Sequence, residues 1–246
     1  MYKYIFILAF FSTYLFSNST TILSAANLKF FFEDLTKEYN KQYPNDKIDV
    51  EFDSSGNISD QILKGKNYDI FLSANMTYPK KVYNNNKSAT KPKKYTTGAL
   101  ILLISTHKGL SNSKLDILKD DEIKEITIAN KKTAPYGVAA IQALKNANLY
   151  DKIKSKLYYS TNASNIIGDV LWYGHVGILP KSAINSLPRG YNMEGENWIE
   201  IDQKLYDPIV QGYTLSEHGI KNDVSNRFIK FLLSDGQKIF KKNGYK

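Results

Sequence analysis

The sequence predicts an α/β protein that contains two successive series of βα units. Strand and helix patterns alternate through residues 20–73, and the alternation resumes in residues 126–179. This order gives largely parallel sheets with right-handed crossovers. A length of 246 residues allows one large domain or two modest ones, and length alone does not choose between them.

The first series begins with a short β-prone run at 20–24. A helix with an apolar face follows, formed by Leu28, Phe31, Phe32, Leu35 and Tyr39. Alternation at 48–52 predicts a half-buried strand, and the next helix carries Ile58, Ile62 and Leu63 and stops at Gly65. Residues 68–73 complete the series as a strand.

The second series follows a connection at 91–94 and a buried strand at 99–104. Strands are expected at 126–129 and 176–179, with a helix over 138–147 and another helix starting near 162–164. Residues 182–200 look irregular, and the run at 208–213 predicts a strand that returns to the first lobe. The remainder is helical, with a capping box expected from Ser234 to Gln237.

The N-terminus has the pattern of a secretory signal peptide. Lys3 precedes an apolar run at 4–16, which is shorter than the roughly 20 residues of a spanning helix, and small residues follow it. We expect residues 1–19 to be removed, with cleavage after Ser17 or Ser19. Because the chain has no cysteine, we expect no disulfide and no lipid anchor on an N-terminal cysteine, which leaves a free periplasmic or secreted protein.

The basic composition argues against nucleic-acid binding. The formal charge is +9, but only two of the 33 basic residues are arginine, the residue best suited to bidentate phosphate contacts. No basic stripe is interleaved with aromatic residues, as single-strand binding requires. The positive field still favours the approach of anions.

Three turns between strands and helices are rich in small and hydroxyl-bearing residues. They lie at 24–27, 53–56 and 134–137, and a fourth helix start is expected at Asn162–Ala163. Helix N-termini beyond the carboxyl ends of strands bind anions through unpaired N–H groups. Each turn alone is an ordinary cap, but four together favour an anion site. Uncharged donors suit a fully ionised dianion, so Asp53 is expected to face outward or to cap its helix.

An enzyme is the main alternative from another class. His107, His175 and His218 stand at unrelated places without metal-ligand spacing, so no metal cation site is expected. No nucleophile elbow, phosphate loop or dinucleotide fingerprint occurs, and no acid and base pair can be named. A receptor for another small anion or an organic solute stays open, with Trp172 or Tyr173 available for stacking.

Several motifs in order resemble the periplasmic molybdate-binding proteins of ABC transporters. They are Ala25–Leu28 before a helix, Ser54–Gly56 after a strand, the runs 68–74 and 134–137, and the closing run 239–245. The resemblance implies a type II-like fold, with two α/β lobes of mixed sheets joined by two crossing strands. Lobe I would comprise 20–97 plus 209–246, and lobe II would comprise 98–208.

The resemblance also implies the ligand, the site and the partners. The ligand would be molybdate or tungstate, held by Ala26, Asn27, Ser55, Tyr136 and Ala163, with no cofactor. The protein would be a monomer that closes by a hinge and docks to a membrane permease. Two residues depart from the pattern: Asn27 replaces a frequent serine, and Pro180 stands where some relatives have a ligand-binding tyrosine, whose hydroxyl Tyr136 would replace.

Overall fold

A computed structural model of the chain describes residues 19–105, 114–173 and 176–246. The expected signal peptide, apart from Ser19, lies outside the described residues, as do His107 and His175. Within the described part, no helix is long and apolar enough to cross a membrane.

The first sheet has five strands in the order β2-β1-β3-β10-β4. Their bounds are β1 Ser19–Ala25, β2 Lys47–Asp53, β3 Ile70–Ser73, β4 Lys93–Gly98 and β10 Ile209–Leu215. Strand β1 runs parallel to β2 and β3, whereas β10 runs antiparallel to β3 and β4. The parallel part is the βαβ arrangement that the sequence predicted.

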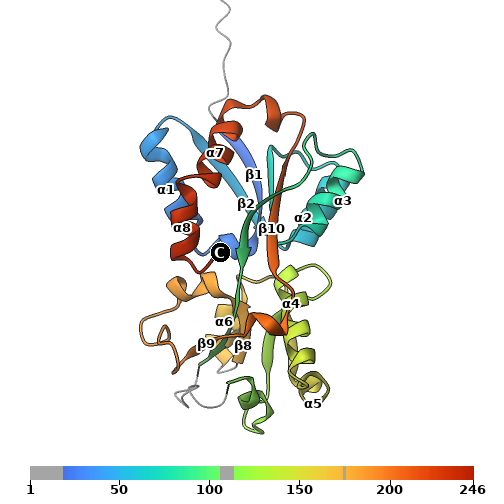
Figure 1. Cartoon of the computed structure of the whole chain (residues 1–246), viewed down its shortest axis with the longest axis vertical. Helices are drawn as coiled ribbons and strands as arrows, with labels where there is room; N and C mark the ends of the chain where they lie inside the picture. The colour runs from blue at the N-terminus through green and yellow to red at the C-terminus, as the bar shows by residue number, and fades with distance from the viewer. Residues whose placement is uncertain (1–18, 106–113, 174–175) are drawn as a thin grey trace, which may run out of the picture.

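Helices cover both faces of this sheet. On one face lie α1 (Phe32–Gln42), α7 (Asp223–Leu233) and α8 (Gly236–Lys242), and on the other lie α2 (Ser55–Leu63) and α3 (Thr77–Asn84) (Figure 1). Side chains alternate between the layers along β1, because Ile22 packs with Phe32 and Phe228 while Leu23 packs with Ile58. The sheet is therefore buried on both sides.

The second sheet repeats this pattern with the order β7-β6-β8-β5-β9. Its strands are β5 Leu100–Ile104, β6 Ile126–Ala129, β7 Leu157–Ser160, β8 Val176–Pro180 and β9 Trp198–Glu200. Again three strands are parallel, β7, β6 and β8, and β5 is antiparallel to β8 and β9. The α-helices packed in this lobe are α4 (Pro135–Asn146), α5 (Tyr150–Ile153) and α6 (Ile166–Tyr173).

Two strands carry the chain between the lobes. The chain leaves β4 at Gly98 and enters β5 at Leu100, and it returns to the first sheet in β10 (Figure 1). Gly98 pairs with Ile209 across this connection. The two-lobed α/β class is confirmed, while the lobe boundaries stay a prediction.

Several local expectations were wrong. Lys93 and Lys94 belong to strand β4 instead of a connection, because their backbone pairs with Tyr213 and Gly212. Residues 182–200 are not wholly irregular, since they contain most of a 3-10 helix, Lys181–Ser186, and strand β9. Other 3-10 turns are Ala26–Leu28, Lys114–Lys119, Lys154–Lys156, Gln203–Leu205 and Gly219–Lys221.

Two helix starts also differ from prediction. Helix α6 begins at Ile166 instead of 162–164, because the side chain of Asn162 first closes a turn with the N–H groups of Ser164 and Asn165. The capping box at Ser234 is absent, because its hydroxyl donates backward to the carbonyls of Lys230 and Phe231. Ser234 therefore terminates α7 and does not start α8.

Candidate functional site

The four predicted turns lie where the two lobes meet. The 3-10 turn at Ala26 follows β1, helix α2 follows β2, helix α4 follows β6, and Ala163 follows β7. Ala25 and Ala74 of the first lobe belong to the same buried cluster as Ala134, Tyr136 and Ala163 of the second. The carboxyl ends of parallel strands from both sheets therefore converge, as the sequence analysis expected.

Hydrogen bonds hold the lobes together on both flanks of this junction. On one flank the Gly56 N–H donates to the Thr133 carbonyl at 2.9 Å, and the Tyr78 hydroxyl donates to the Lys132 carbonyl at 3.2 Å. On the other flank the Ser182 hydroxyl donates to the Asn27 carbonyl at 3.1 Å. The structure is thus a closed arrangement of the two lobes.

Ser55 is buried at the start of α2, and its hydroxyl oxygen already accepts a hydrogen bond. The donor is the N–H of Ala74, at 2.9 Å. A hydroxyl carries one hydrogen and accepts through its lone pairs. The accepted bond uses a lone pair and not the hydrogen, so the Ser55 hydroxyl can direct its hydrogen toward an acceptor in the junction.

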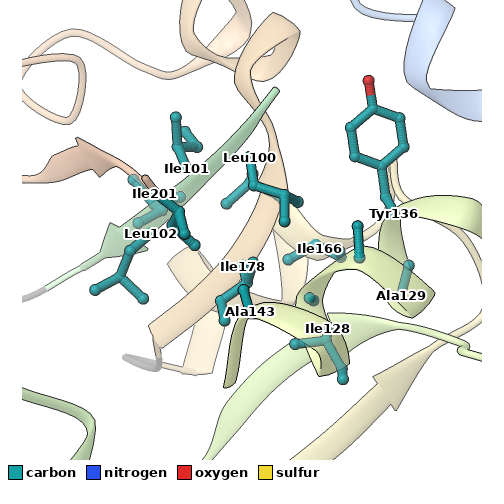
Figure 2. Packing of buried hydrophobic residues seen from close by; sticks show 14 of the residues in the cluster. Leu100, Ile101, Leu102, Ile128, Ala129, Tyr136, Ala143, Ile166, Ile178 and Ile201 are labelled. Carbon is teal, nitrogen blue, oxygen red and sulfur yellow. The ribbon is translucent and has the colours of Figure 1, made fainter. Parts of the chain in front are cut away.

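The hydroxyl oxygen of Tyr136, like that of Ser55, accepts a hydrogen bond from the protein. Tyr136 sits in the first turn of α4, and Pro135 occupies the first helical position, where its missing N–H costs nothing. Figure 2 shows its hydroxyl directed away from the other labelled side chains of the cluster. The Tyr136 oxygen accepts from Nε2 of Gln211 at 2.9 Å. Burial raises the pKa of Tyr136 well above its ordinary value, and the neighbouring Tyr245 adds to this, so the phenol stays protonated.

Asn27 is placed at the junction, but its side-chain hydrogens are already used. Nδ2 donates to Oε1 of Gln211 at 3.0 Å and to the hydroxyl of Tyr245 at 2.7 Å. Its buried Oδ1 has no hydrogen-bond partner among the described residues. The group of Asn27 suited to an anion is therefore its backbone N–H.

Ala26 and Ala163 offer only backbone groups. Both are buried, at 3% and 5% exposure. Beside Ala163, the Asn162 carboxamide oxygen accepts from the N–H groups of Ser164 and Asn165. The N–H of Ala163 takes no part in this cap, so it is the amide that this turn can present to a ligand.

Asp53 does not cap its helix, because the N-cap of α2 is Ser54; the Asp53 carboxylate is bonded within the same turn instead. Its Oδ1 accepts from the Ser54 N–H at 2.6 Å and from Nδ2 of Asn57 at 3.1 Å. The carboxylates of Asp46 and Asp69 are both 7% exposed, and Asp46 is paired with Arg227. Asp69 bonds the Thr21 N–H and His218, away from the junction. The predicted site residues therefore bring no charge to a ligand.

Sequence reasoning missed a second layer of polar residues behind these donors. Gln211, Tyr95, Tyr245 and Ser182 are all buried and hydrogen-bonded to one another or to Asn27. One signal was present in the sequence. A glutamine within the apolar strand run 208–213 has to find partners if it is buried.

The residues of two alternative sites, for a metal cation and for ring stacking, can be located in part in the structure. Among residues 19–105, 114–173 and 176–246 no group of three His, Asp or Glu side chains could hold a metal ion. Trp172 is 86% exposed on α6, outside the buried clusters, and the Tyr173 side chain lies outside the described residues.

The fold and the junction define a two-lobed α/β protein whose lobes meet at the carboxyl ends of their parallel strands, where ligands bind in open α/β sheets. A family model described as bacterial extracellular solute-binding protein matches residues 20–246, and the chain belongs to that family. The family match places it among solute-binding proteins instead of enzymes.

Individual relatives are similar along most of the chain. The molybdate-binding protein ModA of Azotobacter vinelandii is 26% identical over 224 residues, covering 90% of this chain and 87% of that protein. ModA of Rhodobacter capsulatus is 28% identical over 196 residues, covering 79% and 75%. The solved structure of the Azotobacter vinelandii periplasmic molybdate-binding protein superposes with a TM-score of 0.82 at 21% identity, covering 92% of this chain and 98% of that one.

Proposed function

We propose that this protein captures molybdate, and also tungstate, in the periplasm and delivers it to the permease of an ABC transporter. The ligand-binding groups are the hydroxyls of Ser55 and Tyr136 and the backbone N–H groups of Ala26, Asn27 and Ala163. The similarity to molybdate-binding proteins over most of the chain supports the ligand class.

One observation from the structure carries the argument. The two hydroxyl oxygens each accept from a protein N–H, of Ala74 for Ser55 and of Gln211 for Tyr136. Each hydroxyl can then act toward the ligand as a donor. A site made of donors suits molybdate, which has no proton at neutral pH, and it opposes hydrogen phosphate, which needs an acceptor for its proton.

The cellular arrangement follows from the same proposal. The export signal, residues 1–19, is cleaved after Ser17 or Ser19, and the position of Ser19 in β1, where its carbonyl accepts from Nδ2 of Asn222, favours cleavage after Ser17. The mature protein is a periplasmic monomer without a lipid anchor. Its lobes, 20–97 with 209–246 and 98–208, close by bending at the two strands that connect them. Mass spectrometry of the exported protein would test the cleavage position.

Calorimetric titration of the exported protein tests the ligand. Molybdate, tungstate, sulfate and phosphate are titrated separately at the same pH and salt concentration. We expect one tight site for molybdate and tungstate, weaker binding of sulfate and the weakest binding of phosphate. Absence of molybdate binding, or a preference for phosphate, would contradict the proposed function.

A further inference from the structure

Gln211 occupies the centre of the polar layer behind the proposed site. It lies in β10, one of the two connections between the lobes, and its side chain is fully buried. Oε1 accepts from Nδ2 of Asn27 at 3.0 Å and from the Tyr95 hydroxyl at 2.8 Å. Nε2 donates to the Tyr136 hydroxyl at 2.9 Å. The side chain thus joins two residues of the first lobe to one of the second.

The backbone around Gln211 makes room for this contact. The pairing of β10 with β4 shifts register between Gln211 and Gly212. At the end of β4, where Gly98 pairs with Ile209, a Cβ atom on Gly98 would lie 2.1 Å from the Tyr136 oxygen and 3.0 Å from Nε2 of Gln211. Any side chain at Gly98 would therefore occupy the space in which Tyr136 and Gln211 meet.

The hydrogen bonds fix which end of the carboxamide faces Tyr136. Oε1 is directed at two donors, so Nε2 must face the tyrosine. The Tyr136 oxygen then accepts, and its hydrogen goes either to a ligand or to Tyr245, whose hydroxyl is the alternative acceptor. With the opposite amide orientation Tyr136 would have to donate to Gln211 and would face the ligand as an acceptor.

We propose that Gln211 is a positioning and specificity residue, which donates to the Tyr136 oxygen, directs the Tyr136 hydrogen toward the ligand and thereby favours oxyanions that carry no proton. This inference rests on the proposed function of the site. Gln211 acts through Tyr136, so its removal should cost affinity only where the tyrosine hydroxyl is present. A purely structural role predicts the same loss with and without that hydroxyl.

A double-mutant cycle tests the inference. Gln211→Met keeps an uncharged side chain of similar length without amide groups, and it is measured alone and combined with Tyr136→Phe. We expect Gln211→Met alone to weaken molybdate binding about tenfold, the scale of one hydrogen bond to a charged group, and to have about a twofold effect or less in the Tyr136→Phe background. Equal losses in both backgrounds would overturn the proposal.

Ligand discrimination gives a second readout that a structural role would not change. Once Gln211 no longer donates to it, the Tyr136 oxygen can turn its lone pairs toward the ligand and accept from hydrogen phosphate, so the ratio of molybdate to phosphate affinity should fall about tenfold in Gln211→Met. Tyr95→Phe is the matched control. It removes a neighbouring bond to the same side chain but leaves Nε2 in place, so the ratio should change about twofold at most. An unchanged ratio in Gln211→Met contradicts the proposal.

A second variant covers the case in which Gln211→Met fails to fold. Gln211→Glu still accepts from Asn27 and Tyr95 but has no N–H for Tyr136. Its charge repels molybdate equally with and without the tyrosine hydroxyl, so the cycle with Tyr136→Phe cancels that repulsion. If the effects of Gln211→Glu and Tyr136→Phe on molybdate affinity are additive, Gln211 does not act through Tyr136 and the proposal is refuted. The parent protein, titrated alongside, separates the two hypotheses, because absent molybdate binding there refutes the proposed function itself.

Discussion

Ser55→Ala is the substitution that isolates one donor of the proposed site. The Ser55 side chain is 1% exposed, so a hydrogen bond from it to a bound dianion would be shielded from water. A hydrogen bond to a charged group contributes about 1.5 to 3 kcal/mol, which corresponds to roughly a 10- to 150-fold weaker affinity for molybdate. Isothermal titration calorimetry of the exported protein measures this directly.

The same substitution also affects the fold, and the two effects can be separated. The Ala74 N–H loses its acceptor, which costs about 1 to 3 kcal/mol of unfolding free energy when the group stays buried and unpaired. Denaturant unfolding without ligand measures this cost, and titration of the folded variant measures binding.

Ser54→Ala is the matched control, one residue earlier on the same turn. Its hydroxyl caps α2 by accepting from the Asn57 N–H at a long 3.5 Å. Losing this cap should cost about 0.5 kcal/mol of stability and leave the molybdate affinity unchanged. The reasoning is refuted if Ser55→Ala binds as tightly as the parent, or if Ser54→Ala loses as much affinity as Ser55→Ala.

Three further predictions concern Gly56, Asp46 and Tyr136. Gly56→Ala places a methyl group 2.9 Å from the backbone of Thr133, so the lobes should close less completely. Calorimetry should find weaker molybdate binding, and small-angle scattering should find a less compact liganded state. An unchanged affinity would mean that this contact is not needed for closure. The pKa of Asp46 is lowered, because its hydrogen bonds with Arg227 and Tyr39 outweigh burial, which acts to raise it. A carboxyl group with a lowered pKa stabilises the folded state at pH values above its unfolded pKa of about 4, and this stability is lost as the pH falls through the folded pKa. The unfolding free energy should therefore decrease less steeply with falling pH in Asp46→Asn than in the parent protein. Equal slopes for the two proteins would contradict this. Since the pKa of Tyr136 is raised, molybdate affinity should be constant between about pH 7 and 9, and a decline across that range would show that the hydroxyl ionises.

The sequence predicted the site turns because their signals are local. Small and hydroxyl residues after a strand, with a helix beginning at once, define a helix N-terminus within a few residues. The structure accordingly places Ser55 and Tyr136 in the first turns of α2 and α4. The order of strands and helices likewise predicted the parallel core of both sheets.

The use of Asn27 could not be predicted, because its partners lie far away in the chain. Its carboxamide contacts Gln211 and Tyr245, which are 184 and 218 residues further on. Local propensity contains no information about such contacts. For this reason the sequence indicated that Asn27 lies at the site but not that its side chain is engaged by the protein.

The start of strand β4 was missed for a different reason. Lys93 and Lys94 are exposed and polar, which resembles a connection, and β4 is an edge strand of its sheet. Lysines are common on edge strands, where they discourage pairing with other chains. Only the partner strand β10 identifies these residues as part of the sheet.

In a binding site without positively charged side chains, the association rate and the residence time of an anion depend on different groups of the protein. The lysine-rich surface, with a formal net charge of +9, attracts dianions over a distance that added salt shortens. Amide and hydroxyl hydrogens sealed between the lobes feel little of that screening. Raising the ionic strength should therefore lower the association rate constant of the oxyanion and leave its dissociation rate constant nearly unchanged. The bound ion would then dissociate as slowly at high salt as at low salt.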